Sequence, residues 1–145
     1  MEQLQQAIKI AFASQYVFYI KAQNFHWNVE GPDFYEFHIL FERIYDEVGE
    51  SIDTFAEYIR TLQTYVPASF TQLSSISAVN DETTANLQPD AMARELLQDS
   101  DQLASMMESV YHLAEEAEEC GVANFLADRN AAFRKHAWML RSTLK

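Results

Sequence analysis

The sequence predicts an all-α fold in which four long helices form a bundle with one long crossover connection. The 145-residue chain contains only three glycines and three prolines, too few for the tight turns of an all-β fold. Apolar residues recur at helical spacing over four long stretches. Apolar residues make up 48% of the chain, so a chain of this length can bury one core. We therefore expect a single domain over residues 1–145.

The first two helices are expected on either side of Gly31-Pro32. Over residues 2–29, apolar side chains recur at helical spacing until that pair of helix breakers ends the pattern. Residues 33–64 carry an apolar stripe, and Asp33 suits the N-cap position of this second helix. Because the link between them is short, the two helices are expected to be antiparallel neighbours.

A crossover follows, because residues 67–88 are rich in Ser, Thr, Asn and Asp. A few apolar residues within it predict a short helix near residues 69–75. The last two long helices are expected over residues 89–120, opened by Pro89, and 122–143. A connection of about twenty residues can travel the length of a bundle, which is the one-crossover topology of ferritin-like folds.

The charge of the chain limits its partners. Its formal net charge of −12 repels nucleic acid and attracts cations. The first twenty residues contain only Lys9, and the C-terminus offers Arg141 and Lys145, so DNA binding is expected to be weak or absent. No stretch is apolar enough to span a membrane, and a single cysteine, Cys120, fits a reducing compartment. We expect a cytoplasmic protein.

The second predicted helix carries two pairs of metal-binding side chains. His38 and Glu42 lie four residues apart, which places them on one face of the helix. Asp53 and Glu57 have the same spacing. At about 1.5 Å rise per residue, His38 and Asp53 lie about 22 Å apart, too far for one metal centre. Either the pairs are independent, or an antiparallel helix from a twofold-related subunit brings them together. A solvated charged face is the simpler alternative.

His26 adds a further ligand to the first pair. It lies at the end of the first helix, before the turn that brings the second helix back, so His26, His38 and Glu42 can meet. Two imidazoles and a carboxylate suit Fe²⁺, although Zn²⁺ and Cu²⁺ also bind such ligands, typically more tightly. A di-iron centre inside one bundle uses Glu-x-x-His pairs. No histidine here has a glutamate three residues before it.

Two segments resemble a known family. The run Asn24-Phe25-His26-Trp27-Asn28-Val29, followed by Gly31-Pro32, resembles the signature of the Dps family, the miniferritins. Lys135-His136-Ala137-Trp138-Met139-Leu140 resembles that family's last-helix ending, and the similarity covers essentially the whole chain. The resemblance implies a dodecameric hollow shell in which ferrous iron is oxidised, preferably by hydrogen peroxide, at sites between twofold-related subunits. The ferric product would be stored inside.

The resemblance also implies a role for particular residues. It takes three iron ligands from one subunit, namely His26, His38 and Glu42, and two from its partner, namely Asp53 and Glu57. The family often has Asp where Glu42 stands, so the longer arm is expected to alter the metal spacing. The accessory candidates are Trp27 as an electron source, Asp46, Glu47 and Glu50 for ferric oxide nucleation, and Asp128 at an iron-entry pore.

Two other functions remain open from the sequence. Many members of that family bind DNA through basic tails, so a DNA-protecting structural shell is the alternative to iron oxidation and storage. A plain helical bundle with a solvated acidic face is the third reading. The weak basic content of both chain ends argues against the DNA-binding alternative.

Overall fold

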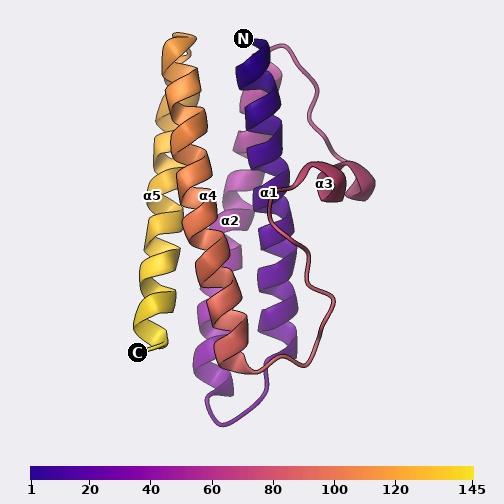
Figure 1. The fold of residues 1–145 in the computed structure, drawn as a ribbon, viewed down its shortest axis with the longest axis vertical. Helices are drawn as coiled ribbons and strands as arrows, with labels where there is room; N and C mark the ends of the chain where they lie inside the picture. The colour runs from indigo at the N-terminus through magenta and orange to yellow at the C-terminus, as the bar shows by residue number, and fades with distance from the viewer.

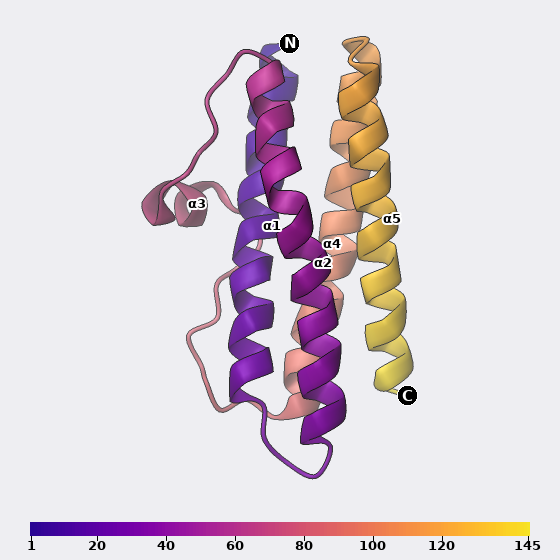
Figure 2. The same ribbon diagram turned by 180° about the vertical axis from the view of Figure 1, so that it is seen from behind.

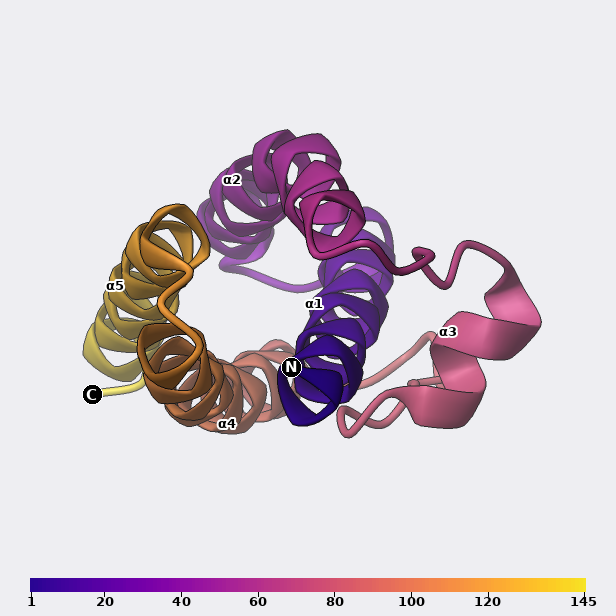
Figure 3. The same ribbon diagram turned by 90° about the horizontal axis from the view of Figure 1, so that it is seen from above.

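Four long helices form the body of the molecule in a computed structural model that describes residues 1–145. They are α1 (Glu2–Asn28), α2 (Phe34–Thr61), α4 (Pro89–Glu116) and α5 (Cys120–Thr143), and a short α3 (Phe70–Ile76) lies in the crossover. The long helices run side by side (Figure 1), and the view from above shows them around a common centre with α3 outside, next to α1 (Figure 3). The predicted all-α bundle with a long crossover is confirmed.

The apolar stripes of the four long helices meet in one core. Its largest fully buried side chains include five phenylalanines: Phe18, Phe25, Phe41, Phe55 and Phe133. Phe18 and Phe133 pack edge to face at 5.4 Å between ring centroids, which joins α1 to α5. Each such side chain contributes about 1.5–3 kcal/mol by leaving water.

The bundle consists of two helical hairpins. The α1–α2 hairpin turns through residues 29–33, and Gly31 adopts φ of 127° there, a conformation that side chains other than glycine rarely accept. The α4–α5 hairpin has a shorter turn at residues 117–119. Figure 2 shows α2 and α5 as neighbours on the face opposite α3 and the crossover. None of the helices is both long and apolar enough to span a membrane.

Polar side chains hold the crossover against the bundle. The backbone N–H of Ala78 donates to Ser14 Oγ at 2.8 Å, and Gln102 Nε2 donates to the carbonyl of Ala78 at 3.1 Å. Asn24 Nδ2 donates to the carbonyl of Glu82 at 3.2 Å. Because these bonds come from both α1 and α4, the crossover has a fixed path along the bundle.

Two helices end earlier than the sequence predicts. The third long helix was expected to reach residue 120, but α4 ends at Glu116, and the second, expected to reach residue 64, ends at Thr61. After α4, Glu118 has φ of 60°, and the next N–H returns to the carbonyl of Ala114 at 2.9 Å. This is the Schellman arrangement, which usually has glycine at the left-handed position. Gln63, with φ of 61°, occupies the left-handed position after α2, and its N–H donates to the carbonyl of Arg60 at 2.9 Å.

Candidate metal centre

The turn between α1 and α2 brings two imidazoles into direct contact. His26 is in the last turn of α1, and His38 is in the second turn of α2. Their rings stack at 3.8 Å between centroids with 14° between planes. His26 is 7% exposed, and His38 is half-buried, so this pair lies at the edge of the core.

Each histidine is held by the backbone of the other. Nδ1 of His26 lies 2.7 Å from the carbonyl oxygen of His38, and Nδ1 of His38 lies 2.7 Å from the carbonyl oxygen of His26. A carbonyl oxygen can only accept, so each Nδ1 carries the hydrogen and donates it. The lone pair of each neutral ring is therefore on Nε2. Metal-ligating histidines use the same second bond to fix tautomer and ring orientation.

Aromatic neighbours fix the two rings further. Phe34 stacks on His38 at 4.8 Å, and Tyr45 packs edge-on against His26 at 5.2 Å. Burial raises the pKa of Tyr45, and the nearby acids Asp46 and Glu42 raise it further. The phenol next to the histidine pair is therefore protonated at neutral pH.

The carboxylates predicted to complete the site lie elsewhere on the protomer. Glu42 is half-buried one turn beyond His38. In the single chain, however, no three or more His, Cys, Asp and Glu side chains are placed to hold one metal ion together. The structure thus joins His26 to His38 without drawing Glu42 into a three-ligand group.

The second predicted pair, Asp53 and Glu57, is exposed towards the other end of α2. A hydrogen bond with Asp53, followed by its negative charge, raises the pKa of Glu57. Asp53 and Glu57 lie four residues apart on one face of the helix, and a cation binding near both would relieve the repulsion between them. One protomer offers an imidazole pair and a carboxylate pair at separate places on the same helix.

The accessory candidates have different surroundings. Trp27 is 64% exposed beside the histidine pair. Asp46 and Glu50 are exposed on α2, and Asp128 is exposed on α5. The three carboxylates are free to meet a cation in solvent, whereas Glu47 is engaged in the bonds described next.

Glu47 holds a polar cluster between α2 and α5 that the sequence did not reveal. Its carboxylate accepts hydrogen bonds from both Nη1 and Nη2 of Arg129, and from Nε2 of His136 at 2.8 Å. Arg129 Nε donates to Gln15 Oε1 at 3.0 Å. Burial alone would raise the pKa of Glu47, but hydrogen bonds and charge from His136 and Arg129 outweigh it and lower the pKa to about 2.

One sequence signal marks this cluster. Arg129 and His136 are only 3% and 2% exposed, and both fall on the apolar stripe of α5 beside Phe133 and Leu140. Polar residues at core positions of a helix are expected to have a buried partner. Their partner, Glu47, lies 82 and 89 residues away in the chain, so pattern alone does not identify it.

Comparisons with known proteins relate this chain to ferritin-like proteins and to bacterial stress proteins. A family model described as Ferritin-like domain matches residues 2–145. The chain is 32% identical over 137 residues to the DNA protection during starvation protein of Brevibacillus brevis, covering 92% of this chain and 89% of that protein. It is 30% identical to general stress protein 20U of Bacillus subtilis, with 99% and 98% covered.

Solved structures of Dps proteins have the same fold as this chain. A Dps protein from Bacillus brevis superposes with a TM-score of 0.93 at 28% identity, over 99% of this chain and 96% of that chain. Dps from Vibrio cholerae, described as a member of the ferritin-like diiron-carboxylate superfamily, superposes with a TM-score of 0.93 at 28% identity. That match covers 99% of this chain and 90% of the other.

Proposed function

This chain belongs to the Dps family of ferritin-like proteins, and from that premise we propose that it is a cytoplasmic ferroxidase and iron store. Two subunits form each oxidation site. Hydrogen peroxide is the oxidant, and a hollow dodecameric shell keeps the ferric product. The proposed ligands are those of the sequence analysis: His26, His38 and Glu42 of one subunit, with Asp53 and Glu57 of the partner subunit.

The reciprocal histidine pair is the observation that supports this proposal best. Both rings present Nε2 lone pairs, and both are fixed by carbonyl bonds of 2.7 Å. The same two bonds join α1 to α2, so they also stabilise the hairpin. They leave Nε2 unprotonated on both rings, as a cation-binding pair requires, because only an unprotonated nitrogen can coordinate a metal.

The separation along α2 supports a shared site. His38 and Asp53 are about 22 Å apart at about 1.5 Å rise per residue. An antiparallel α2 from a twofold-related subunit, crossing near residues 47 and 48, would place one subunit's imidazoles opposite the other's carboxylates. Each dimer would then contain two equivalent sites, one at either end of the paired helices.

The ligands match the reaction in charge. Neutral imidazoles bind Fe²⁺, and carboxylates favour the Fe³⁺ product because their negative charge balances the added positive charge. Two ferrous ions give one electron each to hydrogen peroxide, which takes up two protons and leaves as two water molecules. Paired transfer releases no hydroxyl radical. Exposed Asp46, Glu50 and Asp128 would then bind ferric iron along the inner wall and the entry route.

The test uses two variants that are each incomplete at a different half of the site. Fe²⁺ is added anaerobically to protein carrying His38→Ala or Asp53→Ala, followed by a peroxide pulse while ferric absorbance is recorded. Each variant is expected to lose rapid oxidation. Unfolding the two together and reassembling them should restore part of it, because mixed dimers contain one intact site. Glu36→Ala, an exposed acid on the same helix, is the matched control and should behave as the parent.

Two results would count against the shared site. If both variants oxidise iron as fast as the Glu36→Ala control, the α2 acids form only a solvated face. If the single variants are inactive and mixing restores nothing, the two pairs do not act in one site. Size measurement checks the shell, because a dodecamer has about twelve times the 16.7 kDa mass of the chain.

DNA protection is the second candidate function, because the relative from Brevibacillus brevis carries that name. The net charge of −12 opposes it, since duplex DNA repels an acidic surface. A gel-shift assay at low salt is expected to show no retarded duplex. Retardation that disappears as salt rises would instead establish a DNA-binding function.

A further inference from the structure

A line of phenol side chains begins at the histidine pair. The Tyr45 ring packs edge-on against His26 at 5.2 Å, and Tyr19 packs against Tyr45 at 6.0 Å. Tyr16 packs against Tyr19 at 5.9 Å with 88° between the planes. All these separations lie within the usual range for aromatic contacts. The three phenols therefore form an unbroken series of ring contacts leading away from the proposed iron site.

We propose that Tyr45, Tyr19 and Tyr16 form a relay that removes an oxidising equivalent from the iron site when peroxide meets only one ferrous ion. The inference rests on the proposed ferroxidase function. A site holding one ferrous ion can supply one of the two electrons that peroxide needs. The nearest oxidisable side chain with an onward path is Tyr45, because its ring contacts both His26 and Tyr19.

The residue types along this series fit electron transfer better than packing alone. Ring contacts continue from Tyr16 to Phe12 and from there to Phe55, and phenylalanine is far harder to oxidise than tyrosine. The phenols thus occupy the part of the series nearest the histidines, and phenylalanines occupy the more deeply buried part. Phenylalanine would pack in the first three positions too, but it could not pass on an electron.

Tyr19, the middle residue, occupies space that α2 leaves open for it. A Cβ added to Gly49 would lie 3.0 Å from Tyr19 Cε2, so glycine allows the ring to approach the helix. Glycine inside a helix is unfavourable, and the contact with Tyr19 gives a reason for it. Gln23 Nε2 donates a hydrogen bond to the Tyr19 hydroxyl at 3.2 Å. A phenoxyl oxygen can only accept, so this donor also stabilises the oxidised form.

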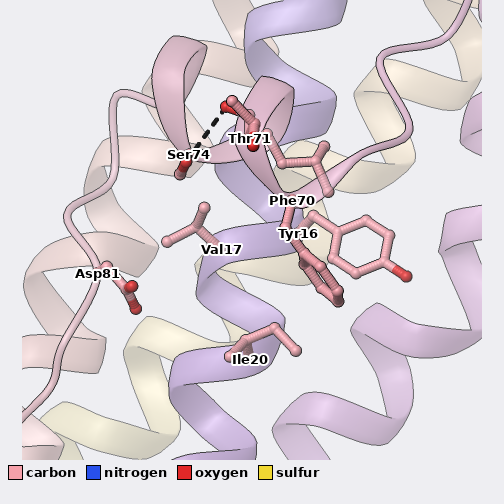
Figure 4. A pocket seen from close by; sticks show the side chains of 8 residues that line it. Tyr16, Val17, Ile20, Phe70, Thr71, Ser74 and Asp81 are labelled. Carbon is pink, nitrogen blue, oxygen red and sulfur yellow. Dashed lines mark hydrogen bonds between the residues drawn. The ribbon is translucent and has the colours of Figure 1, made fainter.

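The far end of the series meets an open groove. Tyr16 lines a pocket of about 340 Å³ between α1 and α3, together with Val17, Ile20 and Phe70. Figure 4 shows the side chains that line this groove, Tyr16 and Phe70 among them. An oxidising equivalent that reaches Tyr16 is thus within reach of solutes and away from the site where peroxide reacts.

The electrons and protons balance as follows. Hydrogen peroxide takes one electron from Fe²⁺ and one electron with one proton from the Tyr45 phenol. A second proton comes from solvent, and two water molecules form. The Tyr45 radical then takes an electron from Tyr19, and Tyr19 takes one from Tyr16, with protons exchanged through solvent because all three rings are half-buried. A later Fe²⁺, with a proton from solvent, reduces the radical back to the phenol.

The test looks for the radical directly. Protein is loaded anaerobically with less than one Fe²⁺ per site, treated with peroxide, frozen within milliseconds and examined by electron paramagnetic resonance. The parent is expected to give a tyrosyl signal that narrows when ring-deuterated tyrosine is incorporated. Tyr45→Phe, which keeps the ring that touches His26, should lose most of this signal. Tyr35→Phe is the matched control, because Tyr35 is near His38 in sequence but 69% exposed, and it should keep the signal.

Two other variants place the radical along the series. In Tyr19→Phe the signal should remain but change its hyperfine pattern, because the radical stays on Tyr45. A signal that is lost equally in Tyr45→Phe and Tyr35→Phe, or one unaffected by tyrosine deuteration and removed in Trp27→Phe, would overturn the relay. Ferric absorbance from the same samples separates the two proposals. Iron oxidation without a tyrosyl radical refutes the relay alone, and no peroxide-dependent oxidation in the parent refutes both.

Discussion

Replacing Glu47 with glutamine is expected to weaken the connection between α2 and α5. The carboxylate is the only anion paired with Arg129 and His136, and both partners are almost fully buried. Glutamine has a similar shape, but it brings no charge, and its amide nitrogen cannot accept a hydrogen bond. Arg129 would then keep its bond to Gln15 while its charge lacks a counterion in the core.

The pKa of Glu47 sets the size of this effect. A pKa lowered from 4.5 to about 2 corresponds to at most about 3.4 kcal/mol, at about 1.4 kcal/mol per unit. The Glu47 side chain is 38% exposed, and solvent screening reduces the contribution to about 2 kcal/mol. For a chain of this length we expect the melting temperature to fall by about 4–8 °C.

The lowered pKa of Glu47 fixes how its contribution to stability changes with pH. The folded-state pKa lies below the unfolded value of 4.5, so the contribution of Glu47 is fully present above 4.5. It is lost as pH falls towards 2. The difference between the parent and Glu47→Gln should therefore be constant from pH 6 to 8 and shrink in acid.

Urea unfolding followed by circular dichroism measures the difference, with all proteins at one subunit concentration because assembly also stabilises the fold. Glu50→Gln, an exposed acid one turn away with no ion pair, is the control and should stay within about 0.5 kcal/mol of the parent. If Glu47→Gln matches Glu50→Gln, the cluster does not stabilise the bundle and the argument from its pKa is wrong.

Three further predictions follow from single positions. Glu118→Gly should raise the free energy of unfolding in urea by about 0.5–1 kcal/mol, because glycine adopts the left-handed conformation without strain. Glu116→Gly, at the last helical residue of α4, should lower it. Burial, followed by a hydrogen bond to Glu82, raises the pKa of Glu95 to about 7, so folding loses stability as pH rises from 4.5 to 7. Glu95→Gln should remove that loss, and an equal gap between variant and parent at pH 5 and pH 8 would contradict this. Zn²⁺ added before Fe²⁺ should slow ferric absorbance changes, since imidazoles bind zinc more tightly; an unchanged rate would argue against Nε2 coordination.

The fold was predictable because apolar residues recur at helical spacing in each of the four long helices. The stripes from Leu4 to Phe25 and from Phe37 to Ile59 are buried as their spacing indicated. The ends of α2 and α4 were less predictable, because Gln63 and Glu118 occupy left-handed positions that usually hold glycine. In the sequence, Gly121 is the nearer stop signal for α4, and it lies inside α5 instead.

The sequence predicted that the two histidines of the candidate site lie close together, but it did not predict their hydrogen bonds. The spacing of His26 and the turn at Gly31 indicated that the two imidazoles can meet. The exchange of Nδ1 bonds with the opposite carbonyl depends on the exact path of residues 29–33, which no periodicity describes. The position of Asp53 and Glu57 relative to the histidines of another subunit depends on assembly, and their pairing stays a prediction.

The middle of α2 contacts both α1 and α5, and this fits a metal site whose proposed ligands lie at the two ends of the helix. Glu47 bonds the helix to α5, and Gly49 lets α1 approach through Tyr19. Gln15 Nε2 also donates to Ser51 Oγ at 2.9 Å, which adds a hydrogen bond to α1. If two α2 helices cross near residues 47 and 48, the separation between imidazoles and carboxylates depends on how rigidly this segment is held. Fixing the middle of the helix therefore keeps both proposed iron sites at their working geometry, because each site takes ligands from both of its ends.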